Sequence, residues 1–126
     1  MNAMRTARSA YSGVRAGTRT ARDVEYQVFS RITRDMCRAI DDPSAGFPSL
    51  VAALHENRKL WNTLAADVAD TQNGLPDMLR ARILFLAEFT HHETDNILSG
   101  SGNARALVDI NMAVMRGLGN QREVNP

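Results

Sequence analysis

Residues 57–64 read Asn-Arg-Lys-Leu-Trp-Asn-Thr-Leu, and this stretch contains the only tryptophan of the chain. One apolar face surrounds it, within about 40° on a helical wheel at about 100° per residue. The face comprises Leu50, Leu54, Trp61, Leu64 and Val68. This spacing predicts an amphipathic helix over residues 48–70. Asn57 lies about 20° from Leu50, in the middle of the face that should be buried.

The helix predicted over residues 103–118 repeats this pattern. With Leu107 at the origin, Asn111 lies about 40° away and therefore falls on the apolar side. A buried amide without a partner costs about 1–3 kcal/mol. We therefore expect Asn57 and Asn111 to meet in one polar cluster with Arg58 at its edge, or to bind backbone groups at helix ends or in loops. The alternative is that each amide faces solvent at a frayed edge.

The chain is predicted to be all-α, a compact bundle of about five helices in a single domain over residues 1–126. Strand signals are scarce, whereas helical periodicity recurs along the chain. The expected helices span residues 2–16, 20–40, 48–70, 76–98 and 103–118. Pro48 and Pro76 suit first helical turns, and Gly117 and Gly119 are expected to stop the last helix.

Composition is that of an ordinary globular protein, with 44% hydrophobic and 23% charged residues in 126. The longest apolar run, residues 83–87, is far shorter than the ~20 residues of a membrane-spanning helix. The basic start lacks the hydrophobic stretch of a secretory signal. The single cysteine, Cys37, excludes an internal disulfide and suits a reducing compartment. We expect a cytoplasmic protein without a membrane partner.

Charge is concentrated at the start of the chain. Residues 1–22 contain five arginines and no acid, giving +5, so the remaining residues sum to −4 because the whole chain has a net charge of +1. Such a segment can contact RNA, lipid headgroups or an acidic partner. The alternative is a mobile basic segment over residues 1–18 or a solvated first helix, which the absence of interleaved aromatic residues favours.

The only constellation that resembles a catalytic or metal site is residues 91–95, His-His-Glu-Thr-Asp. Zinc requires three or four converging ligands, and the HExxH order is absent. His91 and His92 point away from the apolar face of their helix and are expected to be solvated. Cys37 lies near Arg34 and Arg38 but lacks a base partner, so we expect a small core residue. The sequence predicts no enzyme, no metal and no cofactor.

Several segments, in order over about 110 residues, resemble the flagellar biosynthesis regulator FlaF family. The matching segments are residues 10–11, 22–26, 29 and 32–33, 57–64 with 67, 73–76, 79–81, and 107, 110–111 and 115–118. The chain departs from the family pattern in two places: residues 91–95 stand where the family often has a basic, serine-rich stretch, and Gly74 stands where a small residue such as alanine is commoner.

The resemblance implies a small, helical, non-enzymatic protein needed to make the flagellar filament. Such proteins act after transcription, on flagellin production or export, and are thought to oppose FlbT, which restrains flagellin translation. The most concrete role is chaperone-like binding of flagellin. The alternative is RNA binding by the arginine-rich start, acting on flagellin mRNA.

A flagellin helix would bind in an apolar groove lined by the extra apolar sides of the second and fourth helices. The candidate partner-binding residues are Phe29, Met36, Leu84, Phe85 and Phe89. Met78, Met112 and Met115 would join Met36 in adapting to more than one flagellin, because methionine repacks easily. For each residue, ordinary core packing is the competing interpretation.

Overall fold

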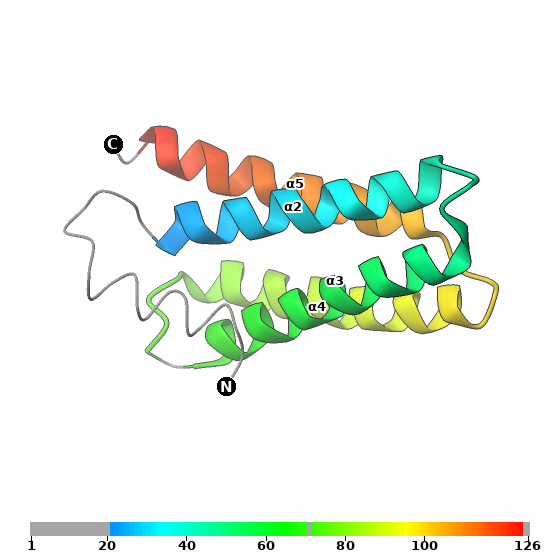
Figure 1. Ribbon diagram of the computed structural model, residues 1–126. Coiled ribbons are helices and arrows are strands. Elements are labelled where there is room, and N and C mark those ends of the chain that lie inside the picture. Colours follow the sequence, from blue (N-terminus) through cyan, green and yellow to red (C-terminus); the bar gives the residue numbers. More distant parts are fainter. Residues whose placement is uncertain (1–20, 71, 125–126) are drawn as a thin grey trace.

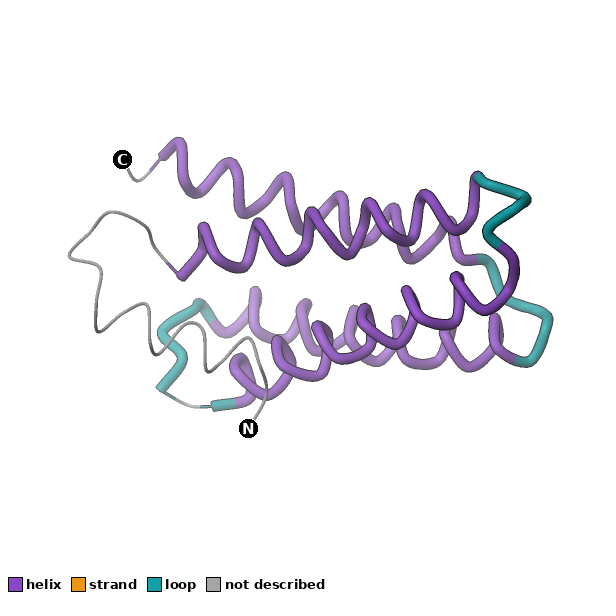
Figure 2. The backbone as a smooth tube through the Cα atoms, in the orientation of Figure 1, coloured by secondary structure: helices purple, strands orange, loops and turns teal. Residues whose placement is uncertain are grey.

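A computed structural model describes residues 21–70 and 72–124 of the chain, and every element in them is a helix (Figure 2). The helices are α2 (Ala21–Asp41), α3 (Gly46–Ala69), α4 (Asp77–Leu98) and α5 (Ala104–Val124). The all-α prediction is confirmed, but the described part holds four helices rather than five. The helix expected over residues 2–16 lies outside the described residues.

The four helices run alternately up and down, so each is antiparallel to the next (Figure 1). α2 lies beside α5, α3 lies beside α4, and the two pairs join mainly through α2 and α3. The packing of α4 on α5 is the least extensive of the four neighbouring pairs. One side of the bundle is therefore held together less tightly than the others.

Most helix boundaries agree with the sequence, but the end of α5 does not. The helix continues through Gly117 and Gly119 to Val124. Glycine ends a helix when its φ becomes positive, and Gly117 does not adopt that conformation. An interior glycine costs about 1 kcal/mol relative to alanine, which a packed helix tolerates.

The turn between α3 and α4 is fixed by Arg80, a side chain in the first turn of α4. Arg80 donates from Nε to the carbonyl oxygen of Val68 (2.7 Å) and from a terminal nitrogen to that of Asp70 (3.2 Å). These contacts satisfy carbonyls that have no partner within α3. Gly74 has φ +89°, a conformation that a side chain disfavours, so glycine suits this position better than the alanine expected for the family.

The core has two adjacent layers. The first is centred on Phe29, Trp61 and Ala87, with Ile32, Leu60 and Leu64 around them. The second layer comprises Met36, Ala53, Leu54, Ile97, Leu107 and Val108. Within the described residues, no helix combines the length and apolarity that crossing a bilayer requires.

Candidate functional site

A hydrogen-bonded amide network lies in the interior and joins three helices. Asn111 of α5 donates from Nδ2 to Asn57 Oδ1 of α3 (2.8 Å) and to Thr33 Oγ1 of α2 (3.1 Å). Trp61 Nε1 of α3 donates to Asn111 Oδ1 (2.9 Å). Asn57, Trp61 and Asn111 are completely buried. The two asparagines therefore meet directly, and they do not face solvent.

Both amide hydrogens of Asn111 are used in the network, whereas those of Asn57 are not. Asn111 uses its oxygen once and both amide hydrogens, whereas Asn57 Nδ2 is buried without a hydrogen-bond partner among the described residues. Because its bonds are lost if α5 slides or rotates, Asn111 fixes the register of α5 against α2 and α3.

Arg58 was expected at the edge of the cluster of Asn57 and Asn111, but it lies outside this network. Its terminal nitrogen donates to the carbonyl oxygen of His91 (3.1 Å) and to Asp95 Oδ1 (2.6 Å), both on α4. The reason is angular: Arg58 lies about 100° from Asn57 on the helix and so faces α4 rather than the interior. It ties α3 to α4 instead.

The histidines of α4 show no metal-site geometry. No group of three or more potential ligands converges anywhere in the described residues. His92 is exposed, whereas His91 is partly buried. Burial lowers the pKa of His91, and the positive charge of Arg58 lowers it further, while Asp95 acts in the opposite direction. His91 is therefore more easily kept neutral than a solvated histidine.

Two of the expected partner-binding residues are core residues. Phe29 and Met36 have no exposed surface. Phe29 packs edge-on against Trp61, with ring centroids 5.8 Å apart and planes at 86°, and Met36 packs in the second core layer. The apolar side of α2 that carries Phe29 and Met36 therefore faces the core. It does not line an open groove through these two residues.

The other three expected residues lie on the surface of α4. Phe85 is 66% exposed and Phe89 39%, and Met78, about two turns before Phe85, is 77% exposed. Together with Arg82, which is also exposed, they form what we call the α4 stripe: Met78, Arg82, Phe85 and Phe89. On the wheel they fall within about 60° of one another, so they share one flank of the helix.

Leu84 is partly exposed but belongs to a different flank. It lies about 140° from Phe89 and about 20° from Asp95, which bonds to α3. The α4 stripe faces the other way: Phe89 lies about 40° from Glu93, whose Oε2 accepts from the backbone N–H of Asn103, just before α5. The five candidate residues therefore do not form a single groove.

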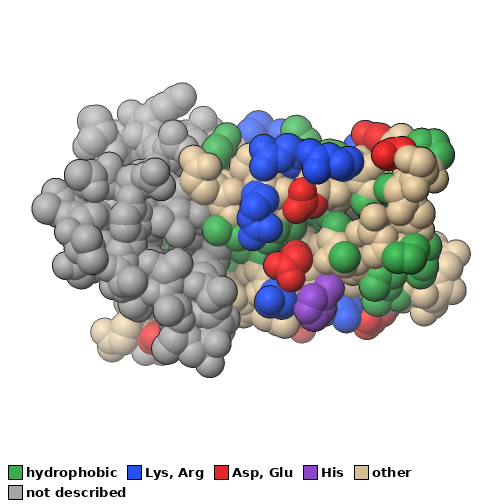
Figure 3. Space-filling model, viewed as in Figure 1, with side chains coloured by type: hydrophobic (Ala, Val, Ile, Leu, Met, Phe, Trp, Pro, Cys, Tyr) green, Lys and Arg blue, Asp and Glu red, His purple; other side chains and the backbone are tan. Residues whose placement is uncertain are grey.

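The remaining exposed hydrophobic side chains are dispersed. Phe47 and Val51 lie at the start of α3, Leu98 at the end of α4 and Met112 on α5. On the described part of the face shown in Figure 3, basic and acidic side chains lie beside hydrophobic ones. Ion pairs on the surfaces of α2 and α3 include Arg31–Asp35 and Glu56–Lys59.

These features define the described part of the chain as an antiparallel helical bundle with a buried amide network and an exposed aromatic flank on α4. The chain belongs to the FlaF family: the model of the flagellar protein FlaF matches residues 7–118. It is thus a flagellar protein. No curated protein and no solved structure gave a match.

Reasoning from the sequence missed Thr33, Trp61 and Arg82. Thr33 and Trp61 complete the network, and a buried tryptophan N–H usually has an acceptor, which is a signal that the sequence contains. Arg82 carries no such signal, because a single arginine within an apolar helix resembles an ordinary solvated residue.

Proposed function

We propose that this protein is a cytoplasmic flagellum biogenesis factor that binds flagellin before assembly, without enzymatic activity. In this role it acts after transcription, on flagellin synthesis or export, with or against FlbT. The observation that carries the proposal is the presence of two exposed phenylalanines, Phe85 and Phe89, on one helix of a flagellar-family bundle. Large apolar side chains exposed together are typical of protein-binding surfaces.

The physical basis of flagellin binding would be recognition of an amphipathic helix by an exposed apolar surface. A helical bundle with an unpaired apolar flank binds an amphipathic helix by burying the apolar face of that helix. Flagellin, in the family context, has helical terminal segments that remain disordered until assembly. Covering those segments would keep flagellin monomeric until export.

Co-expression with the flagellin of the same organism tests the proposal. We expect the two proteins to co-elute in size-exclusion chromatography and to give a binding heat in calorimetry at micromolar concentration. An unrelated globular protein expressed in the same way serves as the control. Separate elution, together with no binding heat, would refute the proposal.

A second candidate function rests on the five arginines and absence of acids in residues 1–22. RNA binding through phosphate contacts would weaken steeply as salt increases. A gel-shift assay with flagellin mRNA at low and physiological salt separates the two functions. Deletion of residues 1–18 would abolish RNA binding and leave flagellin binding intact.

A further inference from the structure

We infer that the α4 stripe is the surface that holds the partner helix, and that Arg82 pairs with a carboxylate on that helix. This inference rests on the proposed function and adds the location and chemistry of the contact. The partner is an amphipathic helix whose apolar face carries one aspartate or glutamate.

The spacing of the stripe matches a helical partner. Positions 78, 82, 85 and 89 follow the i, i+4, i+7, i+11 pattern, so the side chains extend over about 16 Å of the α4 axis. A second helix packed alongside contacts such a row over about three turns with its own i, i+4, i+7 and i+11 residues.

The stripe lies beside the least extensively packed pair of helices. Its small angle to Glu93, which bonds Asn103, places it toward the α5 side of α4, and α4 and α5 pack less extensively than any other neighbouring pair. On α5, Gly117 is exposed, lies about 180° from the buried Val108, and has no neighbour within 4 Å of its Cβ position. The absence of a side chain at Gly117 allows a helix to approach α5 closely while its other side contacts Phe85 and Phe89.

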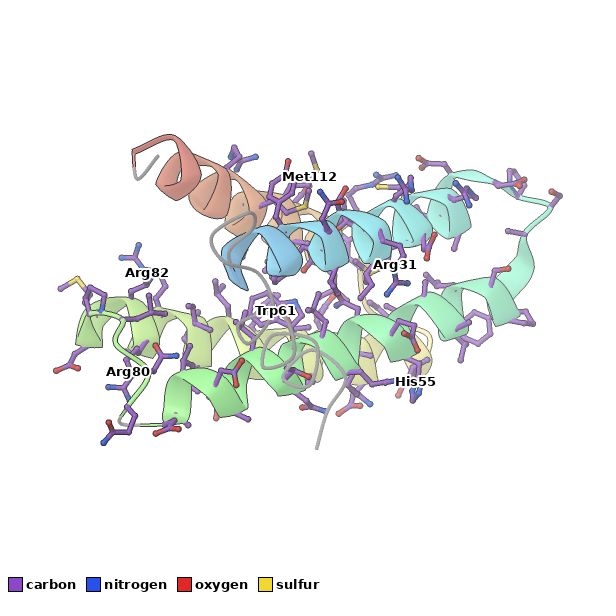
Figure 4. The ribbon with its side chains drawn as sticks, turned by 60° about the vertical axis from the view of Figure 1, so that its left-hand side comes forward. Arg31, His55, Trp61, Arg80, Arg82 and Met112 are labelled. Carbon is purple, nitrogen blue, oxygen red and sulfur yellow. The ribbon has the colours of Figure 1, made fainter. Side chains whose placement is uncertain are left out.

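The charge of the stripe identifies the occupant. Arg82 forms no hydrogen bond or ion pair with any described residue, whereas Arg80, two positions earlier, is fully engaged with Val68, Asp70 and Asp77. Figure 4 shows Arg82 extending from α4 on the side where α5 lies. A cation surrounded by Met78, Phe85 and Phe89 loses solvent when the apolar residues are covered, and it then requires a carboxylate partner.

The start of this chain does not fit as the occupant of the stripe. Residues 1–22 carry five arginines and no acidic residue, so they cannot supply a carboxylate to Arg82. A second copy of the chain is distinguishable because it would produce a dimer of the free protein.

The test uses the full-length protein, full-length flagellin and its terminal peptides, with Phe85→Ala, Phe89→Ala and Arg82→Glu as variants. Phe47→Ala is the matched control, because Phe47 is also a largely exposed phenylalanine (56%) but lies on α3. We expect each stripe variant to raise Kd by about tenfold or more, as truncation of an interface hot spot does. Phe47→Ala should stay within about twofold of the unmodified protein, which is within normal scatter for a residue outside the interface.

Charge reversal gives an independent readout that does not depend on apolar contacts. Replacing each acidic residue of the bound peptide with lysine in turn should identify one substitution that restores binding to Arg82→Glu. The corresponding double-mutant cycle should show strong coupling at that residue alone.

The outcomes separate the two proposals. If unmodified protein binds flagellin and the stripe variants bind equally well, the α4 stripe inference is refuted while the proposed function stands. If Phe47→Ala lost flagellin binding and the stripe variants kept it, the α4 stripe inference would also be refuted. A dimer of the free protein that Phe85→Ala dissociates in analytical ultracentrifugation would show that a second copy covers the stripe. If no flagellin binds at all, both proposals fail.

Discussion

Replacement of Asn111 with alanine should be among the most destabilising single changes in the bundle. The substitution removes the acceptor of the Trp61 N–H and the donor to Asn57 and Thr33, all at a completely buried position. A buried polar group left without its partner costs about 1–3 kcal/mol. With Trp61 and Asn57 both affected, we expect a loss of about 3–5 kcal/mol in the free energy of unfolding.

Asn57→Ala should cost less, although the two asparagines are equally buried. Asn57 contributes one hydrogen bond to the described network, and its Nδ2 is already without a partner. We expect a loss of about 1–2 kcal/mol. Asn62→Ala, on the exposed side of the same helix, is the matched control and should change stability by no more than about 0.5 kcal/mol.

Urea unfolding followed by far-ultraviolet circular dichroism measures all three variants. The order of destabilisation should be Asn111 first, Asn57 second and Asn62 last. The double variant of Asn57 and Asn111 should lose less than the sum of the single losses, because the two side chains share one bond. A loss below about 1 kcal/mol for Asn111→Ala, or an equal loss for Asn57→Ala, would refute the proposed function of Asn111 as the centre of the network.

Three further changes probe the turns and the histidine. Arg80→Met removes the contacts to the carbonyls of Val68 and Asp70 and should lower stability by about 1–2 kcal/mol, with Arg82→Met nearly neutral in the same urea assay. Gly102→Ala would bring a Cβ within 2.7 Å of the backbone nitrogen of Ile97, so melting should occur at a lower temperature than for Gly117→Ala, which meets no atom within 4 Å. Because the pKa of His91 is lowered in the folded protein, the unfolded state binds the proton more readily, and stability should fall as pH decreases through about 6.5. His91→Gln should reduce the stability change between pH 7.5 and 5.5, and an unchanged slope would show that His91 does not contribute.

The sequence was sufficient to predict the amide network because the asparagines interrupt two otherwise apolar helical faces. Leu50, Trp61 and Leu107 define those faces, so a polar residue on either face is conspicuous. The third partner, Thr33, was not predicted, because threonine occurs at half-buried positions for many reasons. Its role depends on the distance between α2 and α5, which no local pattern specifies.

The partner-binding residues were harder to predict because helical periodicity identifies apolar flanks but does not say which flank another helix covers. Phe29 and Phe85 were similar candidates in the sequence, yet Phe29 packs on Trp61 and Phe85 is exposed. The difference lies in the angle on each helix: Phe29 is on the face of α2 that packs on α3, whereas Phe85 lies about 160° from the buried Ala87 of α4. Leu84 shows the same limit, since adjacent residues on a helix point about 100° apart.

The arrangement of polar contacts explains how α4 can present a binding surface and still be held firmly. The buried network joins α2, α3 and α5, and Figure 4 shows Trp61 in the interior between the helices. α4 takes no part in the network. It is attached to α3 by Arg80 at its start and by Arg58 near its end.

Near its end, α4 is also attached to the turn before α5. Glu93 accepts the backbone N–H of Asn103, and this hydrogen bond is the main reason that the pKa of Glu93 is lowered. Among the described residues, these polar contacts lie on the α3 side of α4 or near its C-terminal end, and none lies on the first half of its α5 side. The α4 stripe occupies that half, which is where an added helix would complete the packing of α4 against α5.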